Sequence, residues 1–429
     1  MGVEGVLLLL PAFVGLLYGE KSGACFLFPA TILALIYIIF GIRKPNKTKI
    51  YAKEGMIIVA SAWILWSMFG AIPFTLGGYI PNYLDAFFET VSGFTTTGST
   101  ILNDIESLSH CMHFWRCFTH WIGGMGVLVF VLVLTSLDKK NTMYLMRAEV
   151  PGPEKDKLVP KAMATARILY EMYFALTAVE IVLLIFGGMS PFDSIIHAFS
   201  TAGTGGFSNY ANSIGQLDSA YIDGVITVFM ILFGINFNLF YLLLLRQFKP
   251  VWKNEELRTY LAIIATAIAL ITWNITSIYG NPLKAFRYAA FQVASIITTT
   301  GFSTADYMKW PTMSQTIIII LMIIGACASS TGGGIKVSRF LIVVKSIKKE
   351  LKQMVHPKSV NLIRINGKKM NPDIVQNVFV YLVAYAGIAG LSVLLVSIDD
   401  FDFATNFGSV MGTLNNIGPG LGVSGPAGN

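Results

Sequence analysis

The chain has 429 residues, of which 54% are hydrophobic and only 13% are charged, and its mean hydropathy is +0.63. Soluble domains carry about 25% charged residues, so this composition excludes an ordinary soluble protein and predicts an all-α membrane protein. The formal net charge is +7. Lysine and arginine lie mainly on alternate connections, with 26 of the 31 in residues 43–53, 139–167, 246–258 and 336–369.

Long apolar runs follow one another along the chain, and a bilayer core takes about 20 apolar residues in a helix. We expect full spans near residues 3–19, 24–42, 55–76, 113–137, 165–188, 222–245, 259–279, 315–344 and 376–397. The first is not expected to be a cleaved signal peptide, because it lacks a basic start and a second span follows at once. The four cysteines show no spacing that demands disulfides.

The sidedness of charge predicts the topology. Positive loops stay in the cytoplasm, and the remaining connections carry acidic residues such as Asp104, Asp218 and Asp400. We therefore expect a cytoplasmic N-terminus. Topology alone explains the basic loops without nucleic acid, and docking of a cytoplasmic partner is the alternative.

After two leading spans (residues 1–45), one pattern occurs four times: a span, an apolar half-span, a polar turn with glycine, and a second span. The repeats are expected at residues 46–140, 141–250, 251–352 and 353–429, with the last span of the fourth missing, as in a truncated chain. The half-spans are Tyr83–Phe94, Phe192–Thr201, Leu283–Ile297 and Phe401–Leu414. Each is too short to cross a bilayer, so its turn must be buried in protein or line water.

The four turns are Thr95–Gly98, Ala202–Gly205, Thr298–Gly301 and Asn415–Gly418, and their glycines are 107, 96 and 117 residues apart (205−98, 301−205, 418−301). Charge sidedness puts all four toward the outside, so the repeats are parallel. Half-helices that aim their C-terminal ends at one point favour a cation there, and a ring of backbone oxygens can replace the water shell of a potassium ion. The fourth turn has Asn-Asn-Ile before its glycine, so the expected ring is pseudo-fourfold.

The strings SGFTTTGST (92–100), FSTAGTGGFS (199–208), IITTTGFST (296–304) and GTLNNIGPG (412–420) resemble the four filter loops of the TrkH/KtrB superfamily of potassium transporters. WIGGMGVLV (121–129) and RAEVPGPEKDKL (147–158) add to the likeness, which covers almost the whole chain, and the two leading spans resemble the TrkH branch more than the KtrB branch. The resemblance implies four pore repeats around a central potassium path, a homodimer in the cytoplasmic (inner) membrane, and a TrkA-like cytoplasmic ring. This regulatory ring would bind the nucleotide, NAD or ATP, and no cofactor is expected on this chain.

Carried over by resemblance, the filter positions number twelve: Thr96, Thr97, Gly98, Gly203, Thr204, Gly205, Thr299, Thr300, Gly301, Asn416, Ile417 and Gly418. The bound ion would be K⁺, and no structural metal is expected. The resemblance leaves open how strictly sodium is excluded. A fourth-repeat barrier arginine, which the family implies, cannot be named in this chain.

The span 315–344 contains a run of small residues that should break its helix, since glycine costs about 1 kcal/mol per helical position relative to alanine. The run comprises Gly325, Ala326, Cys327, Ala328, Ser329, Ser330, Thr331, Gly332, Gly333 and Gly334, with Lys336 beyond it. Close helix packing through small residues is the alternative. By resemblance this stretch is a gate loop below the filter, and deleting Ala326–Gly332 should raise ion flux.

Three other features are ambiguous. His113, Cys117 and His120 share one helix face at metal-capable spacing, but ordinary packing explains them as well. Glu180 is an intramembrane carboxylate, which is either functional or paired with a neighbouring helix. Arg287, in the third half-span, would steer cations or anchor that helix.

The preferred function is potassium uptake through a channel-like pore subunit of a Trk-type system. A KtrB-like sodium-dependent transporter and a less selective potassium/sodium permease are close alternatives. An alternating-access transporter is a distant one, because its repeats are usually inverted. No catalytic cluster supports an enzyme.

Overall fold

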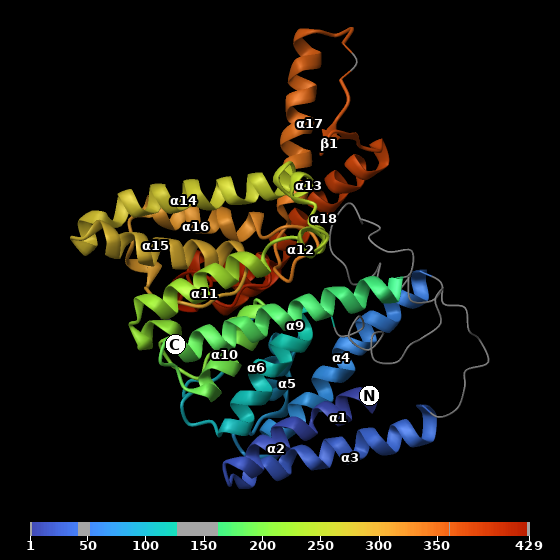
Figure 1. Ribbon diagram of the computed structural model, residues 1–429, viewed down its shortest axis with the longest axis vertical. Coiled ribbons are helices and arrows are strands. Elements are labelled where there is room, and N and C mark those ends of the chain that lie inside the picture. Colours follow the sequence, from blue (N-terminus) through green and yellow to red (C-terminus); the bar gives the residue numbers. More distant parts are fainter. Residues whose placement is uncertain (1, 42–51, 127–161, 360, 427–429) are drawn as a thin grey trace. The chain divides into compact units, whose positions relative to one another are not determined.

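The computed structural model describes residues 2–41, 52–126, 162–359 and 361–426 (Figure 1). These residues are mostly helical, with one two-stranded hairpin. The chain divides into two compact units. The first comprises residues 1–150, 158–229 and 300–304, and the second comprises 151–157, 230–299 and 305–429.

The first leading span is a helix with a break at Leu8, and the second is a continuous helix that changes type along its length. The first consists of α1 (Gly2–Leu7) and α2 (Leu9–Leu17). The second runs through η1 (Lys21–Phe26), α3 (Leu27–Ile36) and a π-helical turn, η2 (Tyr37–Gly41).

The helices found at the places of the four expected repeats follow in chain order. The first spans are α4 (Ala52–Leu76), α9 (Ala162–Phe186), α14 (Glu255–Tyr279) and α18 (Pro372–Val396). The half-spans are α5 (Tyr83–Phe94), α10 (Pro191–Ala202), α15 (Pro282–Ile297) and α19 (Phe403–Leu414). The returning segments are α6 (His110–Gly124), α11 (Ala220–Phe233) with α12 (Phe237–Leu244), and α16 (Thr312–Ile324) with α17 (Val337–Val355). Short helices complete the set: η3 (Ser213–Leu217), α13 (Phe248–Trp252), η4 (Tyr307–Lys309), η5 (Ser397–Asp399) and η6 (Gly422–Ser424).

Each half-helix packs against the span that precedes it: α5 on α4, α10 on α9, α15 on α14 and α19 on α18. The bounds of these four helices agree with those of the expected half-spans to within two residues at either end. Among the described residues, five helices are long and apolar enough to cross a membrane, or six if the bent pair α11 and α12 counts as one. The part of the expected span 113–137 beyond residue 126, the basic segment 139–161 and the motif at 147–158 lie outside the described residues.

The expected span 222–245 is not one straight helix. It breaks between Phe233 and Phe237, where α11 and α12 meet at 93°. The polar side chain of Asn236 caps the restart of the helix by accepting a hydrogen bond from Asn238 N (3.0 Å). An apolar run gives no warning of such a break, because the backbone groups it frees are satisfied by residues far away in the sequence.

The strands β1 (Arg364–Ile365) and β2 (Lys368–Lys369) form an antiparallel hairpin. Its two-residue loop, Asn366-Gly367, has φ of 51° and 76°, as a type I′ turn requires. The loop reaches the start of α14, where Glu255 Oε1 accepts from Asn366 N (3.0 Å) and Asn366 Oδ1 accepts from Glu255 N (2.8 Å). The hairpin thus caps a span of the third repeat.

Glu20 caps the start of α6, although it lies 90 residues before His110 in the chain. Its carboxylate accepts hydrogen bonds from His110 N (2.8 Å) and Cys111 N (3.0 Å), and it also contacts His110 Nδ1 (2.8 Å). Partial burial raises the pKa of Glu20, but these hydrogen bonds more than offset it, so the pKa lies below the ordinary value of 4.5. The ionised carboxylate is thereby favoured in the folded protein.

We expect Glu20→Gln to remove a pH-dependent part of the stability. Because the folded-state pKa is depressed, the contribution is present above the unfolded-state value and is lost as pH falls through the folded-state pKa. The contribution should be about 1 kcal/mol or less. Thermal unfolding in detergent across the acidic range measures it, with Glu171→Gln, an exposed carboxylate on α9, as control. Parallel acid profiles for wild type and Glu20→Gln would contradict this role.

Candidate functional site

The four half-helices begin in the same way. Each has an N-cap side chain whose oxygen accepts a backbone N–H from the first turn, which satisfies a donor that the helix leaves unpaired. The caps are Asn82 (to Leu84 N, 3.0 Å), Ser190 (to Asp193 N, 3.1 Å), Asn281 (to Leu283 N, 2.9 Å) and Asp402 (to Thr405 N, 3.2 Å). Asparagine, serine and aspartate at these positions start four short helices inside an otherwise apolar chain.

The half-helices also end in the same way. The C-cap residues are Thr95, Gly203, Thr298 and Asn415. Each donates its backbone N–H to the carbonyl four residues earlier, at 2.8–3.1 Å. The next residue donates to the carbonyl three residues earlier, at 3.0–3.1 Å in all four turns. In three turns the residue after that, Thr97, Gly205 or Ile417, donates five residues back at 2.8–2.9 Å, which completes a Schellman motif.

The residue after each C-cap is left-handed. Its φ is 60° at Thr96, 53° at Thr204, 61° at Thr299 and 66° at Asn416. Helices usually place glycine here, and a β-branched residue with positive φ is an outlier that costs of order 1–3 kcal/mol. Three threonines hold this strained conformation at equivalent places, so the surrounding structure fixes the turn tightly.

This geometry corrects the expected register of the second turn by one residue. Gly203, Thr204, Gly205 and Gly206 correspond to Thr95–Gly98, whereas the sequence expectation paired Gly205 with Gly98. Gly98, Gly206 and Gly301 all have positive φ, at 80°, 77° and 86°. The spacings become 108 and 95 residues (206−98, 301−206). Gly205 remains in the turn, at the position of Thr97 and Thr300, and Gly206 is the glycine that the sequence expectation missed.

The fourth turn departs from the others at its glycine. Gly418 is absent from the described glycines with positive φ. It precedes Pro419, and a proline pushes the residue before it into extended backbone. Asn416 and Ile417 keep the helix-end geometry, so the fourth repeat matches the rest up to Ile417 and then diverges.

In the first unit, the end of α6 packs between the first two turns. A Cβ added to Gly123 would lie 2.0 Å from the carbonyl oxygen of Phe94, and one added to Gly124 would lie 2.5 Å from Gly203 Cα. The second half of the third turn, from Thr300 on, also belongs to this unit, and a Cβ on Gly206 would lie 2.1 Å from the carbonyl oxygen of Thr300. Backbones this close require glycine.

The predicted break in the helix of residues 315–344 is confirmed. α16 ends at Ile324, and α17 begins at Val337 after an irregular loop, Gly325–Lys336. Gly325 and Lys336 have φ of 71° and 83°, and the buried Lys336 ammonium donates to the carbonyl of Gly332. We call residues 325–336 the intramembrane loop.

The intramembrane loop bonds directly to the third and fourth turns. Gly333 N donates to Thr299 Oγ1 (2.6 Å), and Gly334 N donates to the carbonyl of Asn415 (3.1 Å). A Cβ on Gly332 would lie 2.6 Å from the carbonyl oxygen of Thr298. The glycine run therefore serves close approach to the turns, and packing between helices does not account for it.

The same loop is held from its other side by the break between α11 and α12 and by α14. Cys327 N donates to the carbonyl of Gly234 (3.1 Å), and Phe237 N donates to the carbonyl of Ser329 (3.0 Å). Glu256, a buried carboxylate on α14, accepts from Ala328 N (2.7 Å). Glu256 went unnoticed in the sequence, although a carboxylate at the start of a span was a usable signal.

The other candidate residues from the sequence do not form a metal or ion site together with the turns. The His120 ring stacks on Phe207 with 4.1 Å between centroids, and Cys117 Sγ donates to the carbonyl of Phe207 (3.8 Å). Within the described ranges, no group of three His, Cys, Asp or Glu residues is placed to hold a metal ion. Glu180 is fully buried in α9, and Arg287 lies 5.6 Å from the centre of the Tyr288 ring.

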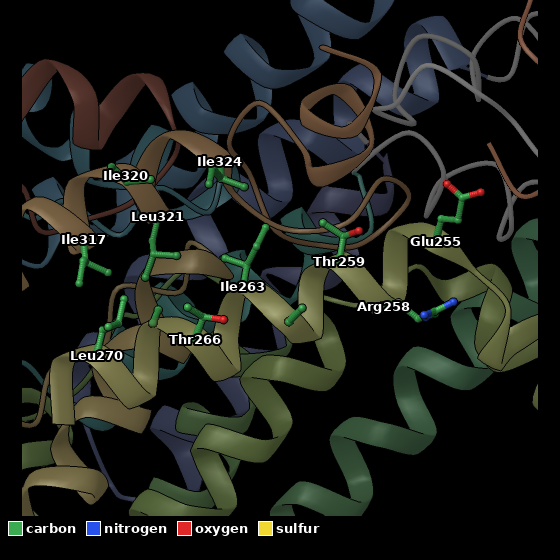
Figure 2. A pocket seen from close by; sticks show the side chains of 12 residues that line it. Glu255, Arg258, Thr259, Ile263, Thr266, Leu270, Ile317, Ile320, Leu321 and Ile324 are labelled. Atoms are coloured by element: carbon green, nitrogen blue, oxygen red, sulfur yellow. The ribbon is translucent and has the colours of Figure 1, made fainter. Parts of the chain in front are cut away.

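A groove between α14 and α16 lies apart from the turns (Figure 2). Glu255, Arg258 and Thr259 line one end of it, and Thr266 lies among the isoleucine, leucine and alanine side chains that line the rest. It contains no residue of the turns, and only Ile324, the last residue of α16, adjoins the intramembrane loop. The groove is therefore not part of the candidate site.

The fold and the candidate site together define an all-α, multi-pass membrane protein built on capped half-helices with backbone turns at their ends. A family model described as TrkH, cation transport protein, matches residues 30–427. The chain belongs to this TrkH family.

Named relatives agree over nearly the full length. The Trk system potassium uptake protein TrkH of Salmonella typhimurium is 37% identical over 424 residues, which cover 97% of this chain and 87% of that protein. TrkG of Escherichia coli is 33% identical, covering 96% and 86%. The crystal structure of the potassium transporter TrkH from Vibrio parahaemolyticus matches with a TM-score of 0.88 at 32% identity, covering 98% of this chain and 88% of that chain.

Proposed function

We propose that this chain is the pore-forming subunit of a potassium uptake system in the cytoplasmic membrane. The observation that carries the proposal is the recurrence of one strained turn at the ends of four capped half-helices. A carbonyl ring is a known way to coordinate a dehydrated potassium ion, and four helix C-termini would add partial negative charge near it. The relatives named as potassium uptake proteins support potassium as the ion.

In this proposal the ion is held by backbone oxygens of residues 96–98, 204–206, 299–301 and 416–418. Gly203, at the second C-cap, would support the turn rather than coordinate the ion. Because Gly418 lacks the positive φ of its counterparts, the fourth turn would present its carbonyl oxygens to the ion in a different arrangement from the other three turns. The filter would then be less symmetrical than that of a fourfold channel.

The intramembrane loop would act as the gate. Its contacts with Thr299 and Asn415 are hydrogen bonds to side-chain and carbonyl oxygens of two filter turns, so it would lie on the ion path on the cytoplasmic side of the filter. Opening would require Gly333 and Gly334 to release these acceptors.

The topology and assembly follow from the charge pattern and from the family. We propose that the N-terminus and the basic segments 43–53, 139–167, 246–258 and 336–369 face the cytoplasm. Such basic surfaces would support a homodimer docked on a nucleotide-binding regulatory ring, with the nucleotide on that partner. The driving force for entry would be the membrane potential, about 2.3 kcal/mol per unit charge per 100 mV.

The test is growth rescue and ion selectivity. The protein, expressed with its cognate regulatory subunit in a bacterium that lacks potassium uptake, should restore growth on low potassium. In proteoliposomes with potassium on one side and sodium on the other, the reversal potential should favour potassium. Failure to rescue despite membrane expression would refute potassium uptake. A reversal potential that favours neither ion would support the less selective permease, and uptake that requires sodium would support the sodium-dependent alternative.

A further inference from the structure

A buried ion pair lies behind the first two turns. Arg116 Nε on α6 is 2.5 Å from Glu89 Oε1 on α5, and the side chains are 2% and 0% exposed. Neither residue was singled out in the sequence, although a charged residue inside an apolar run is a functional candidate by default. Both belong to the first compact unit.

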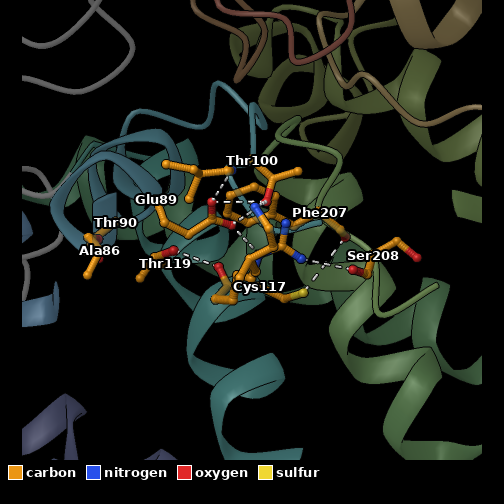
Figure 3. Close-up of polar contacts among 11 residues, drawn as sticks. Ala86, Glu89, Thr90, Thr100, Cys117, Thr119, Phe207 and Ser208 are labelled. Carbon is orange, nitrogen blue, oxygen red and sulfur yellow. Dashed lines mark hydrogen bonds and ion pairs between the residues drawn. The ribbon is translucent and has the colours of Figure 1, made fainter. Parts of the chain in front are cut away.

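The carboxylate of Glu89 holds the segment that leaves the first turn. Both of its oxygens accept from Thr100 Oγ1 at 3.0 Å, and Oε2 also accepts from Ile101 N at 3.0 Å. Thr100 is two residues beyond Gly98. Figure 3 shows the Glu89 carboxylate directed toward Thr100.

The guanidinium of Arg116 holds the segment that leaves the second turn. Nη1 donates to the carbonyl of Ser208 (2.9 Å), and the guanidinium carbon lies 3.7 Å above the centre of the Phe207 ring. Phe207 and Ser208 directly follow Gly206, and both are labelled in Figure 3. One ion pair therefore joins the exits of two turns.

The second exit is anchored at its far side as well. Ser208 Oγ contacts His197 Nε2 (2.9 Å) and accepts from Tyr210 N (3.0 Å). The Tyr210 hydroxyl donates to Asp193 Oδ2 (3.0 Å) at the start of α10. With that side fixed, a change at Arg116 is transmitted to the turn itself.

Stability alone is a poor explanation for such a pair, because replacing a buried ion pair with apolar residues is often neutral or stabilising. The pair instead fixes geometry. The planar guanidinium of Arg116 has several N–H donors in a rigid arrangement, so it holds its partners at defined distances, which a lysine ammonium cannot do. We infer that Glu89 and Arg116 are positioning residues that fix the exits of the first two turns and thereby set the preference for potassium over sodium. This inference rests on the proposed function.

The test uses the full-length protein in proteoliposomes and measures the potassium-to-sodium permeability ratio from the reversal potential. That ratio does not depend on how much folded protein is present, so a purely structural role would leave it unchanged. Glu89→Gln and Arg116→Gln should each lower the potassium-to-sodium permeability ratio about three- to tenfold. This is less than the full free energy of a charge-assisted hydrogen bond would produce, because only part of that energy bears on the difference between the two ions. The double variant should lower it no further, because the two residues act as one unit.

Glu171→Gln is the matched control, since Glu171 forms an exposed pair with Arg167 on α9 and its loss should leave the ratio unchanged. If a neutral variant does not reach the membrane, Arg116→Lys keeps the charge without the fork and should still lower the ratio. Wild-type ratios in the Glu89 and Arg116 variants would overturn the inference. A wild type without potassium preference would instead refute the proposed function, so the two failures are distinguishable.

Discussion

Replacing Gly206 with alanine is expected to reduce potassium-selective transport by at least about tenfold. Gly206 has φ of 77°, and an added Cβ would lie 2.1 Å from the carbonyl oxygen of Thr300. A left-handed conformation alone costs a residue with a Cβ about 1–2 kcal/mol, and the overlap with Thr300 forces a proposed filter carbonyl to move. We expect potassium uptake to fall by at least about tenfold, which corresponds to about 1.4 kcal/mol.

Gly224→Ala on α11 is the control for this prediction, because a Cβ there meets nothing within 4 Å. Rubidium uptake and the reversal potential should be measured at equal amounts of membrane protein. Normal selectivity in Gly206→Ala would contradict the assignment of Gly206 to the filter. It would also mean that the equivalence of Gly206 with Gly98 and Gly301 has no consequence for ion selectivity.

Deleting Ala326–Gly332 is expected to raise ion flux. The two residues that flank the deleted segment, Gly325 and Gly333, already lie close together, since a Cβ added to Gly325 would be 2.4 Å from the carbonyl oxygen of Gly333. The chain can therefore close across the gap with little movement of α16 and α17. An increase of about tenfold would correspond to removing a barrier of about 1.4 kcal/mol from the ion path.

The smaller perturbation of the same loop is Glu256→Leu, which removes the acceptor of Ala328 N and should raise flux less than the deletion does. Glu256→Gln keeps a carbonyl oxygen in that place and serves as its control. Rubidium flux into proteoliposomes measures all three. Unchanged or reduced flux in a folded deletion variant would show that the loop is not a gate.

The sequence allowed the half-helices and their turns to be predicted because both depend on local chemistry. Length separates a half-span from a full span, and a polar N-cap such as Asn82 or Asp402 marks the start of a helix. A glycine following small polar residues marks its end. These signals lie within a few residues of one another, so no tertiary contact is needed to recognise them.

The register of the second turn could not be predicted in the same way. Gly203, Gly205 and Gly206 all offer a permissive backbone, and spacing alone cannot choose among them. The choice follows from which carbonyls of α10 receive the N–H groups of Gly203, Thr204 and Gly205. Hydrogen-bond register is a property of the folded turn.

The break of the second repeat's returning span escaped prediction for a related reason. Residues 222–245 form an apolar run with two glycines, Gly224 and Gly234, and a straight helix satisfies its own backbone. In the structure, the carbonyls of Phe233 and Gly234 and the N–H of Phe237 bond to the intramembrane loop, about 90 residues later in the chain. Partners that distant in sequence leave no periodic signal.

The sequence by itself determined the class of this protein: a helical membrane protein with four half-spans that end in polar turns. These features follow from composition, segment length and capping chemistry, which act locally. Only the tertiary structure decided which glycine of the second turn corresponds to Gly98, where the intramembrane loop bonds, and that Glu89 meets Arg116 behind the first two turns. Those contacts join residues far apart in sequence, and their energies depend on burial and geometry that only the packed chain provides.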